Sequence, residues 1–134
     1  MKHKTLIVIA NYYKDISNNL INSTIEEIEK KKIKYNIIKV SGIFEIPVTI
    51  SKYLSRYDSF IALGCVIKGQ TPHFEFISKS TFNSILQLAV NSKKPIGNGI
   101  ITCLNKSQAK SRSTKKGIEA VNAIISVIQN EPSN

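Results

Sequence analysis

Two kinds of apolar pattern alternate along the chain and predict alternating strands and helices. Short continuous apolar runs are typical of strands buried on both faces, whereas apolar residues three or four positions apart are typical of helices with one buried face. The predicted strands are Thr5–Ala10, Tyr35–Val40, Ser59–Ile67 and Ile96–Leu104. The predicted helices are Ile16–Ile33, Phe44–Leu54, Pro72–Val90 and Gly117–Gln129, with a separate helical turn over Ser107–Arg112.

This alternation predicts right-handed crossovers between parallel strands, with helices on both faces of one sheet. We therefore expect an α/β fold: a three-layer αβα sandwich with a four-stranded parallel sheet, of flavodoxin-like type. Residues 1–134 contain no internal repeat or low-complexity segment, so a single domain is expected.

The charge raises nucleic-acid binding as one alternative, because the formal net charge is +10. Against it, Arg56 and Arg112 are the only two arginines, and the lysines are spread along the chain. Nucleic-acid recognition usually uses arginine forks and aromatic side chains among basic ones. We therefore expect no nucleic-acid partner, while an anionic small-molecule substrate remains compatible with the charge.

The cysteines and the N-terminus indicate a reduced cytoplasmic protein. Cys65 and Cys103 both lie inside apolar runs, as is typical of core thiols, and no Cys/His cluster predicts a metal. The run LIVIA at 6–10 follows basic residues, as in a signal peptide, but it is too short for that or for a membrane span. No membrane partner is expected.

The loops after the first three predicted strands are the expected site, because ligands of parallel α/β sheets bind beyond the carboxyl ends of the strands. In the third loop Gly69 would turn the backbone sharply, and Thr71 and Pro72 would start the next helix. His73 would then lie in the first helical turn, where free amide N–H groups attract phosphate and disfavour imidazolium. Proton transfer by His73 and a purely structural role are equally compatible with these residues.

The other two loops leave similar alternatives open. Tyr12 and Tyr13 suit either stacking on a planar heterocycle or simple packing. Gly42 permits an unusual backbone angle. Phe44 suits the core, and Glu45 suits a helix start through its charge alone. The residues predict proton-transfer chemistry on a phosphorylated or heteroaromatic substrate without naming it.

Four sequence blocks are more specific. They read SGIFEIP at 41–47, ALGCVIKGQTPHFEFI at 62–77, PIGNGIITCLNKSQA at 95–109 and KGIEAVNAI at 116–124. In this order they resemble the 6,7-dimethyl-8-ribityllumazine synthase family of riboflavin biosynthesis. The resemblance implies a cofactor-independent condensation of 5-amino-6-(D-ribitylamino)uracil with 3,4-dihydroxy-2-butanone 4-phosphate. A catalytically weak, flavin- or lumazine-binding or shell-forming relative is the alternative.

The resemblance also implies residue roles. His73 corresponds to the proton donor and acceptor, Gln70 and Thr71 to positions that bind the butanone phosphate, and Arg112 to a phosphate-binding arginine. The remaining implied substrate-binding positions are Tyr12, Ile43, Phe44, Glu45, Cys65, Val66, Ile67 and Asn98. The family commonly has Arg where this chain has Asn11, and an acidic or small residue where it has Gln70.

Assembly follows from topology and resemblance together. Asn98 lies near the start of the fourth predicted strand, at the opposite end of the sheet from His73, so Asn98 and Arg112 are expected to serve a neighbouring subunit. The family forms pentamers or icosahedral shells of pentamers, and riboflavin synthase is a candidate partner. Here the segment from Arg112 to Gly117 is shorter than is usual in the family, which favours an isolated pentamer.

Overall fold

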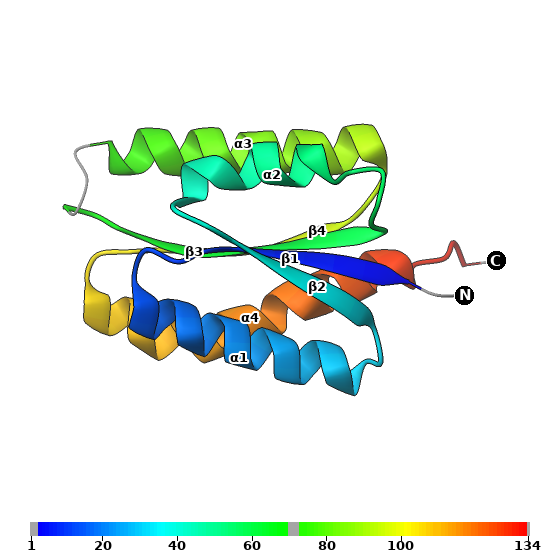
Figure 1. The fold of residues 1–134 in the computed structure, drawn as a ribbon, viewed down its shortest axis with the longest axis horizontal. Coiled ribbons are helices and arrows are strands. Elements are labelled where there is room, and N and C mark those ends of the chain that lie inside the picture. Colours follow the sequence, from blue (N-terminus) through cyan, green and yellow to red (C-terminus); the bar gives the residue numbers. More distant parts are fainter. Residues whose placement is uncertain (1–2, 70–72, 134) are drawn as a thin grey trace.

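Four parallel strands form the middle of three layers (Figure 1). The computed structural model describes residues 3–69 and 73–133 of the chain. The strands are β1 (Lys4–Ala10), β2 (Lys34–Val40), β3 (Ser59–Ile67) and β4 (Ile96–Cys103). Their order in the sheet is β2-β1-β3-β4, so β1 and β3 are the central strands.

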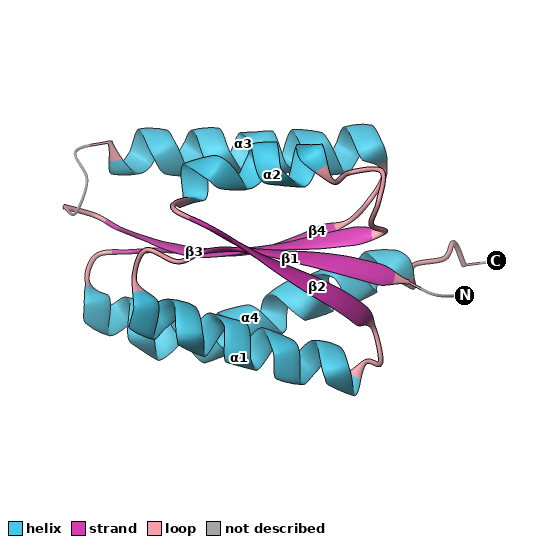
Figure 2. Ribbon diagram, viewed as in Figure 1, coloured by secondary structure: helices cyan, strands magenta, loops and turns pink. Residues whose placement is uncertain are grey.

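Helices cover both faces of this sheet (Figure 2). One face carries α1 (Lys14–Lys30) and α4 (Lys106–Ile128), and the other carries the 3-10 helix η1 (Ile43–Glu45), α2 (Ile46–Lys52) and α3 (Phe74–Ser92). The predicted three-layer sandwich with four parallel strands is therefore confirmed. None of the helices in the described ranges is long and apolar enough to cross a membrane.

Side chains of the central strands point alternately into two hydrophobic cores. Leu6 and Val8 pack on the side of α2 and α3, and Ile7 and Ile9 pack on the side of α1 and α4. All four are at most 2% exposed. Burial on both faces explains why β1 is a continuous apolar run rather than an alternating one.

The sequence prediction was wrong for the last helix, because α4 is continuous where a turn and a separate helix were expected. Gly117 had suggested a helix boundary, but it lies inside α4 at the contact with α1. A Cβ atom at this position would lie 2.8 Å from the carbonyl oxygen of Leu20 and even closer to Ser23 Oγ. Gly117 therefore allows close helix packing and does not mark the start of a helix.

Candidate active site

An apolar pocket opens at the carboxyl ends of β1 and β3 and has a volume of about 270 Å³. It is lined by Ala10, Tyr12, Tyr13, Gly42, Ile43, Phe44, Cys65, Val66, Ile67 and Ile77. Because β1 and β3 are neighbours in the sheet, the loops after them begin side by side. The structure thus brings together six of the predicted site residues: Tyr12, Ile43, Phe44, Cys65, Val66 and Ile67.

The mouth of this pocket is aromatic. Tyr12 is 71% exposed and Phe44 is 68% exposed, although both side chains are large and apolar. Phe44 lies in η1. The N–H of Glu45 donates to the carbonyl of Gly42 and so closes this helical turn. Gly42 itself has φ −156° and ψ 172°, which is ordinary extended backbone, so the conformational freedom that glycine permits is not used here. Two exposed rings beside an apolar hollow are well suited to hold a planar heterocycle.

Cys65 contributes a neutral wall to the pocket. Burial, with a smaller contribution from the neighbouring Cys103, raises the pKa of its thiol to about 12. A thiol with so high a pKa carries almost no thiolate near neutral pH and is a poor nucleophile. Its role here is to line the pocket. The described residues also contain no group of three or more His, Cys, Asp or Glu side chains that could hold a metal ion.

Glu45 lies beside the pocket at the N-cap position of α2. The Ser41 hydroxyl donates a hydrogen bond to Glu45 Oε1 at 3.1 Å and so orients the carboxylate. Glu45 and Phe44 also line a second hollow of about 340 Å³ between α2 and α3, whose other residues are Pro47, Val48, Ser80, Thr81 and Ser84. Phe44 therefore separates the apolar pocket from this groove between the helices.

His73 occupies the N-cap position of α3. Its carbonyl accepts the N–H of Ile77 at 2.8 Å, the first hydrogen bond of the helix. The prediction that His73 lies in the first turn was therefore wrong by one position. Ile77 lines the apolar pocket, so one helical turn links that pocket to His73.

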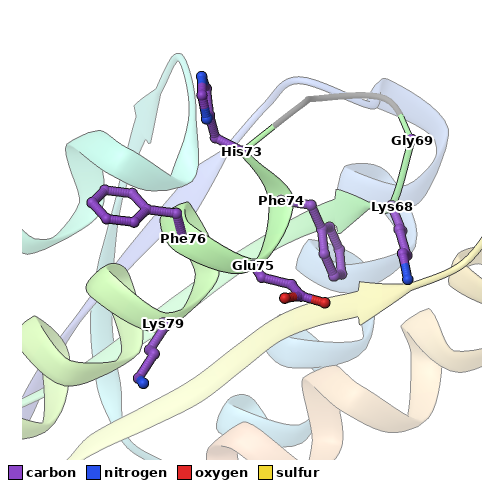
Figure 3. A pocket seen from close by; sticks show the side chains of 7 residues that line it. All are labelled: Lys68, Gly69, His73, Phe74, Glu75, Phe76 and Lys79. Atoms are coloured by element: carbon purple, nitrogen blue, oxygen red, sulfur yellow. The ribbon is translucent and has the colours of Figure 1, made fainter.

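The surface around His73 is a wider and more polar depression (Figure 3) of about 640 Å³. Its described lining includes Lys68, Gly69, Phe74, Glu75, Phe76 and Lys79. Gly69 has φ +87°, which confirms the sharp turn predicted there. The His73 ring points away from the side chains of Lys68 and Phe74. Gln70, Thr71 and Pro72 lie outside the described residues, so the roles expected for them stay predictions.

Asn98 and Arg112 do not line either of these hollows among the described residues. Asn98 pairs with Ala62 in the sheet, and its Oδ1 accepts the N–H of Ile100 at 3.0 Å. Arg112 is exposed on α4, and its Nη1 lies 3.4 Å from the carbonyl oxygen of Thr102. The expected substrate contacts of Asn98 and Arg112 are therefore not made within this chain's own pocket.

Four lining residues were not predicted as substrate-binding, namely Ala10, Tyr13, Gly42 and Ile77. Ala10 and Gly42 directly precede predicted site segments, and the other two are more informative. Ile77 lies one helical turn after His73, and this spacing is the signal that could have found it. Tyr13 follows Tyr12 directly, and its sequence position fits packing as well as stacking. Which interpretation holds depends on the loop conformation after β1, which the apolar pattern does not encode.

Comparison with known proteins decides the family. The family model for 6,7-dimethyl-8-ribityllumazine synthase matches residues 2–131. The chain belongs to this family. Among curated family members, the protein of Agrobacterium fabrum is 36% identical over 139 residues, covering 96% of this chain and 94% of the relative.

Two other relatives with the same printed name agree. The protein of Corynebacterium kroppenstedtii is 34% identical and covers 94% of this chain and 83% of its own length. The protein of Bartonella bacilliformis is 36% identical and covers 92% of this chain and 86% of its own length. The resemblance seen in the four sequence blocks is thus confirmed, and with it the assignment to a lumazine-forming enzyme of riboflavin biosynthesis.

Proposed function

We propose that this protein condenses 5-amino-6-(D-ribitylamino)uracil with 3,4-dihydroxy-2-butanone 4-phosphate at sites shared between subunits, with His73 as proton donor and acceptor. The observation that carries the proposal is the apolar pocket at the carboxyl edge of the sheet. It gathers six residues that the family resemblance assigns to substrate binding, and they come from three separate segments of the chain.

The ribitylaminouracil has a flat heterocycle and a polar chain, and the pocket offers a match for each. The exposed rings of Tyr12 and Phe44 provide surfaces for stacking. Ile43, Val66 and Ile67 supply the apolar wall. Glu45, oriented by Ser41, is the acceptor that the ring N–H groups or the ribityl hydroxyls would use.

The phosphorylated substrate belongs on the side of His73. The start of α3 offers backbone N–H groups without helical partners, and Lys68 and Lys79 line the same depression. The reaction joins the amino group of the uracil to the ketone, expels phosphate and closes the second ring, and each of these steps moves a proton. An imidazole beside the bound phosphate is placed to give and take those protons. Holding the two substrates together supplies much of the remaining acceleration.

A homopentamer would complete the site. The layer of α2 and α3 exposes large apolar side chains, namely Val48, Phe76, Leu86 and Val90, each more than 60% exposed. These exposed side chains favour burial against another copy of the chain, and in the proposed pentamer Asn98 and Arg112 would serve the neighbour's pocket. The short Arg112–Gly117 segment favours the isolated pentamer over a shell.

A cytoplasmic location and a partner enzyme are also proposed. Both cysteines are free thiols, which suits the reducing cytoplasm. The product is a lumazine, and riboflavin synthase, which consumes it, is the candidate partner.

The decisive experiment mixes the purified protein with both substrates and follows the fluorescence of the lumazine product. The mass of the protein in solution is measured on the same sample. We expect turnover well above the uncatalysed background and a particle of pentamer mass. A rate equal to the background, or full activity in a monomer, would contradict the proposal. Tight binding of lumazine without turnover would instead favour the catalytically weak relative.

A further inference from the structure

Tyr13 connects the pocket mouth to the hydrophobic core. Its ring meets the ring of Tyr12 edge to face, with centroids 4.8 Å apart and an interplanar angle of 83°. The other side of Tyr13 packs against the core cluster between the sheet and the helices α1 and α4. Its backbone is fixed as well, because it is the N-cap of α1 and its carbonyl accepts the N–H of Ser17 at 2.8 Å.

Among the residues that the structure describes, none supports Tyr12 in a comparable way. Its side chain is 71% exposed, and it is not part of either core cluster. An exposed tyrosine exchanges rotamers freely, and a ligand that stacks on it must restrict this motion. The ring of Tyr13 is the described contact that limits where the Tyr12 ring can lie.

We propose that Tyr13 is a positioning residue for substrate binding, which holds the Tyr12 ring in place at the pocket mouth so that the heterocycle can stack on it. The inference rests on the proposed function, because it takes the ribitylaminouracil as the stacked ligand. In this proposal the aromatic ring of Tyr13 positions Tyr12, and the Tyr13 hydroxyl is not required.

The environment of the Tyr13 hydroxyl agrees with this assignment. Burial raises the pKa of the phenol above its ordinary value, and Cys65, Tyr12 and Cys103 add to the shift. The side chain therefore stays neutral at physiological pH and contributes no charge to the pocket.

The test compares Tyr13→Leu, which removes the aromatic ring, with Tyr13→Phe, which keeps it. Tyr35→Leu is the matched control, because Tyr35 is also a partly buried tyrosine packed on the same core but lies on β2 near the amino end of the sheet. Steady-state kinetics with the ribitylaminouracil varied would give kcat and KM, and calorimetry would give the Kd of the same compound for the intact assembly.

We expect Tyr13→Leu to raise KM and Kd about three- to tenfold, as an aromatic pair contact of this kind implies, with kcat within about twofold of wild type. Tyr13→Phe should match wild type. Tyr35→Leu should lower stability without changing KM. An unchanged KM in Tyr13→Leu, or an equal rise in Tyr13→Phe, would overturn the inference.

A double-mutant cycle tests whether Tyr13 acts through Tyr12. If it does, adding Tyr13→Leu to Tyr12→Leu should change Kd by less than about twofold, because the ring to be held is already gone. Fully additive losses would show that Tyr13 contacts the ligand independently. If Tyr13→Leu does not fold, Tyr13→Met replaces it in the cycle. Wild-type protein that neither binds nor turns over the compound would refute the proposed function instead, so the two failures are distinguishable.

Discussion

Gly117 of α4 and Thr24 of α1 meet so closely that a Cβ atom on Gly117 would lie 2.7 Å from Thr24 Oγ1. Thr24 is fully buried, and its hydroxyl already donates to the carbonyl of Leu20 at 2.7 Å, so it has little room to move. In an exposed helix, replacing Gly by Ala would stabilise by up to about 1 kcal/mol. Here we expect Gly117→Ala to destabilise the protein by about 1–3 kcal/mol, because overpacking outweighs the helix propensity.

Urea denaturation of Gly117→Ala measures this effect. Ala123→Gly is the matched control, because Ala123 is exposed in the same helix, and it should cost about 1 kcal/mol through propensity alone. A rise in stability for Gly117→Ala would contradict the packing argument.

Gly117 also illustrates a feature that the sequence alone could not predict. The strands followed from continuous apolar runs, because burial on both faces of a parallel sheet requires them, and the alternation then placed the site at the carboxyl edge. The sequence could not distinguish a glycine at the start of a helix from one inside a helix that admits a neighbouring helix, because that depends on α1, which lies far away in the chain. In the same way, the apolar pocket was predictable from strand ends, whereas the support of Tyr12 by Tyr13 depends on how one loop turns.

His73→Ala should lower kcat about ten- to a hundredfold, with a small change in KM for the ribitylaminouracil. The loss is partial because the two substrates would still be held together. His3→Ala is the control, since the only other histidine lies at the amino end of the sheet, where its Nε2 is 2.9 Å from Ser59 Oγ. Stopped-flow fluorescence of product formation gives both constants. Wild-type kcat in His73→Ala would remove His73 from the mechanism.

Cys65 should make the protein lose stability at alkaline pH. Its folded-state pKa is about 12 against an ordinary value of 9.0, so the unfolded thiol releases its proton first as the pH rises. The contribution of this pKa difference to the free energy of unfolding is therefore fully present below about pH 9. It is lost progressively as the pH rises between the two pKa values. Cys65→Ser should remove this contribution, so the free energy of unfolding of wild type should fall more steeply from pH 9 to about pH 11. Equal slopes in urea titrations of the two proteins would contradict the assignment.

Mixing two impaired variants tests the shared site. His73→Ala impairs the half of the site on α3, and Arg112→Ala, on α4, should raise KM for the phosphorylated substrate. If each site combines His73 of one subunit with Arg112 of its neighbour, co-refolded subunits in equal amounts should regain about a quarter of the wild-type sites, because each half is intact in half of the subunits. If one chain supplied both residues, no site in the mixture would be intact and activity would stay at the mean of the two variants.

The assay is run at a low concentration of the phosphorylated substrate, where the Arg112→Ala defect is largest, and each variant refolded alone is the control. Recovery above that mean therefore distinguishes a site built between subunits from one built within a subunit.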